Sequence, residues 1–399
     1  MRKVLLIAQE YPPAKGAGVE RTFALSRDLQ DFGWQPIVLT MKPRAYDMFD
    51  TSRKIPHDLV PYVFRAFSFN AARDFSLAGK YPGILSIPDR WSSWFFDGYR
   101  TGYNLISQYQ PQLIWSTFPV ATSHLIALFL KKRSGLPWVC DFRDPMPFHY
   151  SKCLSLQKKA FQWIDARSVQ QADASVFVTN HMKQLYAKSY PNFTKKFHII
   201  ENGYNEENYK NIKIEEKKPD GFFRMLHSGT ISEERRNPRV VFDALKILKQ
   251  ESKISSDRFV FIFRGVNNPE YFEKLADMSD VSDLIQFLPD TDYANSLQEM
   301  FTVDALVAIQ GEIYKNQIPG KIYEYIRAKK PILAISSTDS AVGQFIEQFE
   351  FGLVGNSPAA IAEHIEKIMN GSLRVECEVE RFSRYSRAKE FAKLFDSLI

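Results

Sequence analysis

Short apolar runs of about five residues recur along the chain, and stretches whose apolar residues follow a helical spacing lie between them. This alternation predicts parallel sheets that are covered by helices on both faces. Seven strands are predicted in the first half of the chain, at residues 4–8, 36–40, 62–67, 113–117, 138–142, 174–178 and 198–201. Six more are predicted in the second half, at residues 224–227, 259–264, 285–288, 305–309, 331–335 and 352–354.

A charged, poorly apolar stretch at residues 208–221 separates the two series of strands. Thirteen strands exceed the usual size of one open sheet, so the pattern predicts two α/β domains, residues 1–205 and 206–380. A surface loop within one large domain is the alternative interpretation of the charged stretch. Residues 381–399 have apolar side chains at helical spacing among basic ones, which predicts a terminal amphipathic helix that packs on the protein.

The composition is that of a globular protein, with 45% hydrophobic and 25% charged residues in a chain of 399. The apolar runs are far shorter than the roughly 20 residues that cross a bilayer, and we interpret the N-terminal run as a strand rather than a secretory signal. Three cysteines, Cys140, Cys153 and Cys377, are too few and too scattered for a disulfide framework. They fit a reducing compartment, so a cytoplasmic location is expected.

The charge differs in sign between the two halves of the chain. Residues 1–205 contain 26 Lys and Arg against 15 Asp and Glu, and the rest contain 26 against 31. A basic half of this size suggests nucleic acid, an anionic membrane surface or a phosphorylated ligand as a partner. The sequence has no zinc-finger spacing, no basic zipper region and no RNP signature, which argues against nucleic acid.

Two candidate site stretches lie in the basic half. Gly16 and Gly18 lie in a loop between the first strand and a helix that is expected to open around residues 20–21, where backbone amides could bind an anion or a hydroxyl-rich ligand. A tight strand-to-helix turn needs glycine for its own sake, which is the alternative. The second stretch is DFRDP, with Arg143 and Asp144 at the carboxyl end of a buried strand, where ligands bind in open α/β sheets. An internal ion pair of Arg143 with an aspartate is the alternative there.

Two further stretches lie in the second half. Arg235 and Arg236 follow Gly229 in the loop before a predicted helix, and guanidinium groups bind phosphate oxygens in a fixed geometry. Pairing with the neighbouring glutamates is the alternative. Gly320 opens another helix that carries Lys321, so a helix N-terminus and a lysine meet at one place, although an ordinary capped helix remains an alternative.

Several catalytic motifs are missing from the sequence: the P-loop, the nucleophile elbow, His-Glu-x-x-His and Gly-x-Gly-x-x-Gly. Their absence argues against P-loop, serine-hydrolase, zinc-protease and dinucleotide-dehydrogenase chemistry. Potential ligands do not cluster in the sequence either, so no metal site is expected.

The order and spacing of YPPxxGxGxER, LxxxGWxPxVLT, DFRDP, FVTN, IIENGYN, HSGTISEERRNP and PGKIYEYIRAKKPILAI resemble bacterial glycosyltransferase family 4 along essentially the whole chain. PGKIYEY and DFRDP resemble its polysaccharide-building branch. The resemblance implies a GT-B fold, in which two Rossmann-like domains face a cleft and the C-terminal helix crosses back to the N-terminal domain. It also implies that the acceptor binds the N-terminal domain and a nucleotide-diphosphate sugar binds the C-terminal one, with retaining transfer and no required metal or other cofactor.

The resemblance also implies roles for single residues. Glu324 matches the second glutamate of the family's paired motif, which binds the nucleotide ribose, whereas the first position falls on Asn316, with Glu312 as an uncertain substitute. Thr230 stands where many members have an arginine, which leaves more of the phosphate charge to Arg235 and Arg236. Asp144 is the candidate for the role of a histidine that many members have in this loop, in preference to His124. The expected catalytic residues are Asp144, Arg143, Arg235 and Lys321, and the expected binding residues are Gly16, Gly18, Gly229, Arg236, Gly320, Ile322, Glu324 and Asn316.

The expected activity is therefore transfer of a sugar from a nucleotide-diphosphate donor to a lipid-linked saccharide, at the inner membrane face, in surface polysaccharide or O-antigen assembly. A nucleotide-sugar 2-epimerase of the same fold and a catalytically degenerate binding partner are the alternatives. The stretch at residues 81–103 interleaves aromatic side chains with Arg90 and Arg100, which suggests contact with an anionic membrane surface. A helix packed on the N-terminal domain is the alternative for this stretch.

Overall fold

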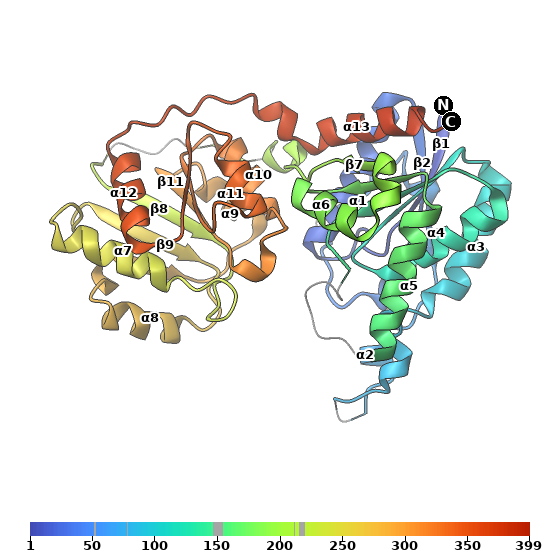
Figure 1. Cartoon of the computed structure of the whole chain (residues 1–399), viewed down its shortest axis with the longest axis horizontal. Helices are drawn as coiled ribbons and strands as arrows, with labels where there is room; N and C mark the ends of the chain where they lie inside the picture. Colours follow the sequence, from blue (N-terminus) through green and yellow to red (C-terminus); the bar gives the residue numbers. More distant parts are fainter. Residues whose placement is uncertain (52, 78, 147–154, 211, 215–219) are drawn as a thin grey trace. The chain divides into compact units, whose positions relative to one another are not determined.

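The computed structural model describes all residues of the chain except 52, 78, 147–154, 211 and 215–219. The described residues form two compact units, Met1–Asn202 with Arg384–Ile399, and Gly203–Ser383. Each unit is a parallel sheet with helices on both faces (Figure 1). The predicted α/β class with two Rossmann-like domains is confirmed.

The sheet of the first unit has seven parallel strands in the order β3-β2-β1-β4-β5-β6-β7. The chain starts in the middle of this sheet, runs outward to β3, crosses back to β4 and continues to the other edge. This order is typical of doubly wound sheets, in which ligands bind where the direction reverses, here at the carboxyl ends of β1 and β4. The strands are β1 (Arg2–Ile7), β2 (Trp34–Met41), β3 (Val63–Ala66), β4 (Leu113–Thr117), β5 (Trp138–Phe142), β6 (Ala174–Phe177) and β7 (Phe197–Ile199).

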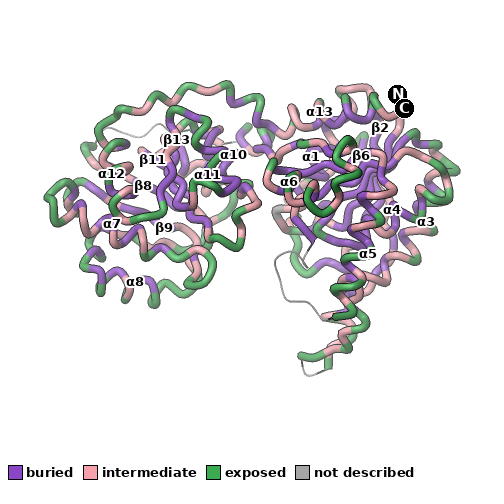
Figure 2. The backbone as a smooth tube through the Cα atoms, viewed as in Figure 1, coloured by how far each residue is buried: buried purple, intermediate pink, exposed green. Residues whose placement is uncertain are grey.

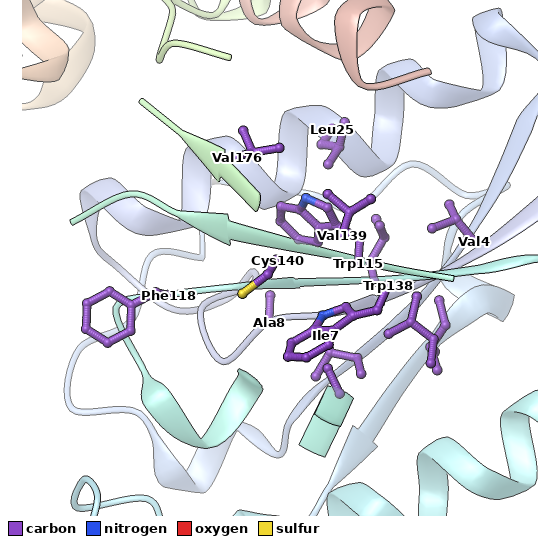
Figure 3. Close-up of a cluster of buried hydrophobic side chains, with 14 of the residues drawn as sticks. Val4, Ile7, Ala8, Leu25, Trp115, Phe118, Trp138, Val139, Cys140 and Val176 are labelled. Atoms are coloured by element: carbon purple, nitrogen blue, oxygen red, sulfur yellow. The ribbon is translucent and has the colours of Figure 1, made fainter. Parts of the chain in front are cut away.

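Two tryptophans show how helices cover both faces of this sheet. Trp115 of β4 pairs in register with Val139 of β5, so Trp115 and Trp138 point to opposite faces, as Figure 3 shows. Trp138 lies against His124 on the α4 side, and both indoles are fully buried. The helices before the C-terminal segment are α1 (Ala17–Asp28), α2 (Ala71–Asp74), α3 (Trp94–Tyr109), α4 (Ala121–Ser134), α5 (Ser155–Gln171) and α6 (Asn180–Ser189).

The C-terminal helix α13 (Arg384–Asp396) packs on the first unit, as predicted. Its Phe391 ring lies 6.0 Å from the ring of Trp115, and its Phe395 ring lies 5.4 Å from that of Trp34. The indole of Trp34 also donates a hydrogen bond of 2.8 Å to Asp396. The last helix therefore completes the core of the unit that begins the chain.

The second unit has six parallel strands in the order β10-β9-β8-β11-β12-β13, which reverses direction between β8 and β11. The strands are β8 (Phe223–Ser228), β9 (Phe259–Arg264), β10 (Ile285–Leu288), β11 (Ala305–Ile309), β12 (Ile332–Ile335) and β13 (Gly352–Gly355). The helices are α7 (Arg239–Gln250), α8 (Pro269–Met278), α9 (Tyr293–Glu299), α10 (Gly320–Ala328), α11 (Ala341–Ile346) and α12 (Pro358–Met369).

Burial follows the layers of each unit (Figure 2). The central strands are largely buried and the edge strands β3, β7 and β10 are partly exposed, while the helices bury one side and expose the other. In the second unit, α9, α10 and α11 pack against one face of the sheet, and α7, α8 and α12 pack against the other face. Both sheets are thereby covered on both sides, as expected for strands that read as continuous apolar runs.

Candidate active site

In the first unit, Arg143 connects three loops at the carboxyl ends of the strands. Its guanidinium forms an ion pair of 2.9 Å with Glu10, in the loop after β1. It also donates hydrogen bonds to the carbonyl oxygens of Gly18, at the start of α1, and Phe118, in the loop after β4, at 2.7 and 2.5 Å. Arg143 is partnered by the protein on all sides, so it holds the loops rather than presenting a free cation.

Gly18 is required by this arrangement. A Cβ at Gly18 would lie 1.4 Å from a carboxylate oxygen of Glu10 and 2.6 Å from a guanidinium nitrogen of Arg143. Gly16, by contrast, precedes α1 in an extended conformation, and a Cβ there would meet Glu10 at 3.4 Å. The structure therefore gives Gly18 a packing role, which differs from the alternative considered for this loop, a glycine required by the turn itself. α1 begins at Ala17, earlier than predicted, because an extended glycine without a side-chain cap leaves little signal in the sequence.

Asp141 forms a buried ion pair that the sequence analysis did not identify. Its carboxylate accepts two hydrogen bonds from the guanidinium of Arg21, at 3.0 and 2.8 Å, and one from the hydroxyl of Thr117 at 2.8 Å. Arg21 also donates to the carbonyl oxygens of Ile200 and Glu201, at 2.8 and 2.7 Å. Asp141, one of the two aspartates considered as partners of Arg143 in the alternative interpretation, thus pairs with Arg21, and Arg143 pairs with Glu10. The partners lie far apart in the sequence, so no local spacing could have revealed them.

Asp144 lies at the carboxyl end of β5, directly after Arg143, and is half-buried. Burial raises the pKa of its carboxyl, the nearby charge of Glu10 raises it further, and Arg143 opposes both effects. A carboxyl group with a raised pKa at the mouth of an open sheet has the properties of a proton acceptor or an electrostatic stabiliser.

His124 is fully buried in α4, as the packing interpretation expects. Its Nδ1 lies 2.8 Å from the hydroxyl of Ser116, and its ring lies 5.0 Å from the ring of Phe142. Burial and the charge of Arg143 lower the pKa of His124 to about 3, so the imidazole is neutral at physiological pH. His124 is therefore a core residue and not a substitute for Asp144.

In the second unit, Gly229 and Lys321 meet at the point where the sheet reverses direction. Gly229 follows β8 with a φ of +130°, a region that favours glycine, and a Cβ there would lie 2.8 Å from Nζ of Lys321. Lys321 is in the first turn of α10 and donates a hydrogen bond of 2.7 Å to the carbonyl oxygen of Ser228. Gly229 thus lets the ammonium group lie directly against the backbone.

Lys321 is held in an unusual electrostatic state. Burial and the nearby guanidinium of Arg236 lower its pKa to about 7, and Glu324 opposes this shift. A partly uncharged lysine beside a second cation is a place where an anion would be stabilised, because a bound negative charge removes the repulsion between the two cations. α10 adds the amide groups of its first turn, since its N-cap, Pro319, makes no side-chain cap.

The arginine loop between β8 and α7 is tied to the loop after β11. Arg236 lies over the ring of Tyr314, at 5.4 Å from its centre, and donates a hydrogen bond of 3.2 Å to the hydroxyl of Thr230. Arg235 is exposed and donates to the Tyr314 hydroxyl at 3.3 Å. A Cβ at Gly311 would lie 2.2 Å from the carbonyl oxygen of Arg235, so the two loops touch along their backbones. Tyr314, which joins both arginines, was not identified from the sequence.

Glu324 is half-buried on α10 and accepts a hydrogen bond of 2.6 Å from the hydroxyl of Tyr293, the first residue of α9. Tyr293 is a second residue that the sequence analysis missed, since it comes from a different element. Of the remaining candidates, Ile322 is fully buried and anchors α10, whereas Gly320 is exposed at its start. Asn316 lies between α10 and the short 3-10 helix that contains Glu312, which is exposed.

Two pockets flank the arginine loop. One, of about 590 Å³, is lined by Thr230, Arg235 and Arg236 together with Asn267, Tyr271 and Tyr314. The other, of about 290 Å³, lies over the ends of β11 and β12 and is lined by Arg235, Gln310, Glu312 and Ser336 among others. Neither of these two pockets is lined by Lys321 or Glu324. The predicted donor-binding residues therefore form two groups, the arginines in a pocket wall and the residues at the start of α10.

The described part of the chain contains no group of three or more His, Cys, Asp or Glu side chains placed to hold a metal ion. Among the described helices, none is long and apolar enough to cross a membrane. Cys140 and Cys377 are free thiols, while Cys153 lies outside the described residues.

The sequence profile of Glycosyltransferase Family 4 matches residues 17–208, which make up most of the first unit. Residues 17–208 belong to Glycosyltransferase Family 4. The chain is a glycosyltransferase, and the predicted family and enzyme class are confirmed. Comparison with curated protein sequences finds no significant match.

Solved structures with the same arrangement extend the likeness to the whole chain. A glycosyltransferase from Rickettsia africae is 14% identical with a TM-score of 0.65, and the match covers 100% of this chain and 98% of the other. Anabaena HepE, determined with UDP and glucose, is 12% identical with a TM-score of 0.65 and full coverage of both chains. The lipopolysaccharide outer core galactosyltransferase WaaB is 13% identical with a TM-score of 0.65, covering 99% of this chain and 100% of the other. At these identities the likeness shows the fold, and it confirms GT-B.

Proposed function

We propose that this glycosyltransferase takes a sugar from a nucleotide-diphosphate donor held by the second unit and transfers it, with retention, to a lipid-linked saccharide. The observation that carries the proposal is the cationic site where β8, α10 and the arginine loop meet. Lys321, Arg236 and the amides of α10 lie where the strand order of the second sheet reverses. Gly229 lies beside them, and its lack of a side chain makes room for Lys321. Anabaena HepE, of the same fold, was determined with UDP-glucose bound, which supports UDP as the first nucleotide to test.

The chemistry follows from this placement. When the bond between the sugar and the diphosphate breaks, negative charge develops on the leaving phosphate oxygens. Lys321, Arg236 and the first amides of α10 would stabilise that charge, with Arg235 at the rim of the adjacent pocket. Glu324, oriented by Tyr293, would accept hydrogen bonds from the ribose hydroxyls. Gly320, at the start of α10, and Asn316, in the loop before it, are assigned to the same donor site, and the buried Ile322 anchors α10.

On the acceptor side we assign Asp144 to the reaction and Arg143 to positioning. Asp144 combines partial burial with a raised pKa, whereas the guanidinium of Arg143 is engaged by Glu10, Gly18 and Phe118. Gly16 and Gly18 then shape the loop that approaches the acceptor rather than bind a cofactor. The basic charge of the first half suits a phosphorylated, lipid-linked acceptor at the inner membrane face. Surface polysaccharide, capsule or O-antigen assembly is the proposed pathway class.

The experiment combines donor binding with turnover. UDP binding is measured by calorimetry, and UDP release is followed with a panel of UDP-sugars, with and without lipid-linked saccharides extracted from the source organism. We expect release that depends on the acceptor. Release that is equal without an acceptor, or tight UDP binding with no transfer to any extracted lipid, would contradict the proposed reaction.

Two variants test the donor site directly. Lys321→Ala and Glu324→Ala each remove a charge-assisted contact, so UDP should bind more weakly by about 1.5 to 3 kcal/mol in each. Lys315→Ala is the matched control, because Lys315 is an exposed lysine of the loop before α10. Wild-type UDP affinity in both site variants would remove these residues from the donor site.

A further inference from the structure

Helices α3, α4 and α5 form a layer on one face of the first sheet (Figure 1), with α3 packed against α4 and α4 against α5. Exposed residues recur on each helix at intervals of three or four, so each helix turns one side to the solvent. We call this surface the outer helix face. It is made of Phe96, Arg100 and Tyr103 of α3, Phe129, Lys132 and Arg133 of α4, and Leu156, Lys158, Lys159, Trp163 and Arg167 of α5.

Several large apolar side chains are exposed to solvent on this face. Phe96 is 76% exposed, Leu156 55% and Trp163 44%, although each lies on a helix whose other side is well buried. Trp91, Trp94 and Phe95, which the sequence suggested for membrane contact, instead pack inward, and Trp94 is fully buried. The exposed aromatic residues therefore come from three separate helices and not from one stretch of sequence.

The charge of the outer helix face is uniformly positive. α3, α4 and α5 contain two acidic residues, and both point inward: Asp97 accepts a hydrogen bond from the backbone of Phe67, and Asp165 is fully buried beside Tyr186. None of the cations of this face forms an ion pair with another residue in the described part of the chain. Lys132 and Arg133 instead lie over the aromatic rings of Phe129 and Tyr103, at 5.7 and 5.5 Å from the ring centres.

The opposite face of the same unit is different. On α13, Arg387 pairs with Glu201 and Glu390, and Asp396 pairs with Arg2. α13 thus carries the acidic residues Glu390 and Asp396 among its exposed lysines, Lys389 and Lys393, so the charge of this face is mixed and not uniformly positive.

We propose that the outer helix face docks the first unit on a bilayer that contains anionic phospholipid. Aromatic rings favour the headgroup boundary, and cations without carboxylate partners are attracted to anionic headgroups, so both properties of the face match this partner. The purpose of docking rests on the proposed function, in which the acceptor is lipid-linked, but binding itself does not require turnover.

The experiment is co-sedimentation of the full chain with vesicles of phosphatidylcholine alone and of phosphatidylcholine mixed with phosphatidylglycerol. We expect binding to the mixed vesicles only, and release as salt screens the charges. The emission of Trp163 should shift to shorter wavelength on binding, and Trp163→Phe should lose that shift while the protein remains bound.

Variants locate the surface. Arg100→Glu combined with Lys159→Glu should weaken vesicle binding by more than roughly tenfold, because two basic side chains that attract anionic headgroups are replaced by acidic ones that are repelled by them. Lys389→Glu combined with Lys393→Glu makes the same change of charge at two exposed positions of α13 and should leave binding unchanged. Phe96→Ser should weaken binding to the mixed vesicles without altering its salt dependence.

Three results would overturn the inference: equal binding to both kinds of vesicle, equal loss in the α13 control, or duplex DNA binding more tightly than the vesicles and depending on the same residues. UDP binding is measured on every variant. Vesicle binding that persists in the Arg100→Glu, Lys159→Glu variant contradicts only a docking role for these residues, whereas wild-type protein that binds vesicles but not UDP contradicts only the proposed function.

Discussion

Single residues in this glycosyltransferase are placed so that their ordinary chemistry changes. Lys321 is the clearest case, because burial and Arg236 lower its pKa to about 7 while its ammonium lies against the backbone of Gly229. A bound anion raises the pKa of such a lysine, so the lysine takes up a proton when the anion binds. The affinity of the site should therefore depend on pH in a range where an ordinary lysine is fully charged.

We expect UDP affinity to fall as the pH rises from 7 to 9. The protonated form of Lys321 binds diphosphate, so its pKa rises in the complex, and above pH 7 binding must take up a proton at a cost of up to about tenfold per pH unit. Calorimetry at several pH values checks this. Lys321→Arg, whose side chain stays charged, should bind UDP with little pH dependence in the same range. An unchanged pH profile in that variant would show that another group titrates.

Asp144 allows the acceptor side to be tested separately from the donor side. Asp144→Asn removes the charge with little change of shape, so we expect loss of transfer with UDP affinity nearly unchanged. Initial rates and UDP calorimetry on the same preparation check this. A parallel loss of UDP binding, or full activity, would return the DFRDP segment to a purely structural role.

At the scale of the elements, the sequence predicted the strands well where an apolar run is bounded by turns. The runs at 113–117, 138–142, 259–264 and 305–309 are strands with the predicted bounds. The start of α1 was predicted too late, because Gly16 provides no side-chain cap. The pairs Arg21–Asp141 and Glu10–Arg143 were not predictable, since their partners meet only after β1, α1 and β5 have been brought together.

The crowding at Gly18 gives an element-scale prediction. Gly18→Ala should destabilise the first unit by about 1 to 3 kcal/mol, because the new methyl group overlaps the carboxylate of Glu10 and displaces Arg143. Gly16→Ala, two residues earlier in the same loop, is the control and should change stability far less. Urea unfolding followed by tryptophan fluorescence measures both. Similar losses in the two variants would show that loop flexibility, and not the close approach of Glu10, requires the glycine.

At the scale of the whole molecule, the two units have separate cores, and the first core includes residues from both ends of the chain. Phe391→Ala should therefore lower the stability of the first unit by about 3 to 5 kcal/mol, since a buried ring against Trp115 is lost. Differential scanning calorimetry should show a shift of the transition of the first unit alone. Lys393→Ala, at an exposed position of the same helix, should leave both transitions in place.

The packing of α13 also has a consequence for synthesis on the ribosome. The surface around Trp34 and Trp115 that α13 covers is made early, but residues 384–399 follow the entire second unit. At translation rates of roughly 5 to 20 residues per second, synthesis of the second unit delays the packing of α13 on that surface by on the order of ten seconds or more. During this interval the nascent first unit exposes apolar side chains that chaperones bind, and the second unit, which needs no later segment, is complete before the first.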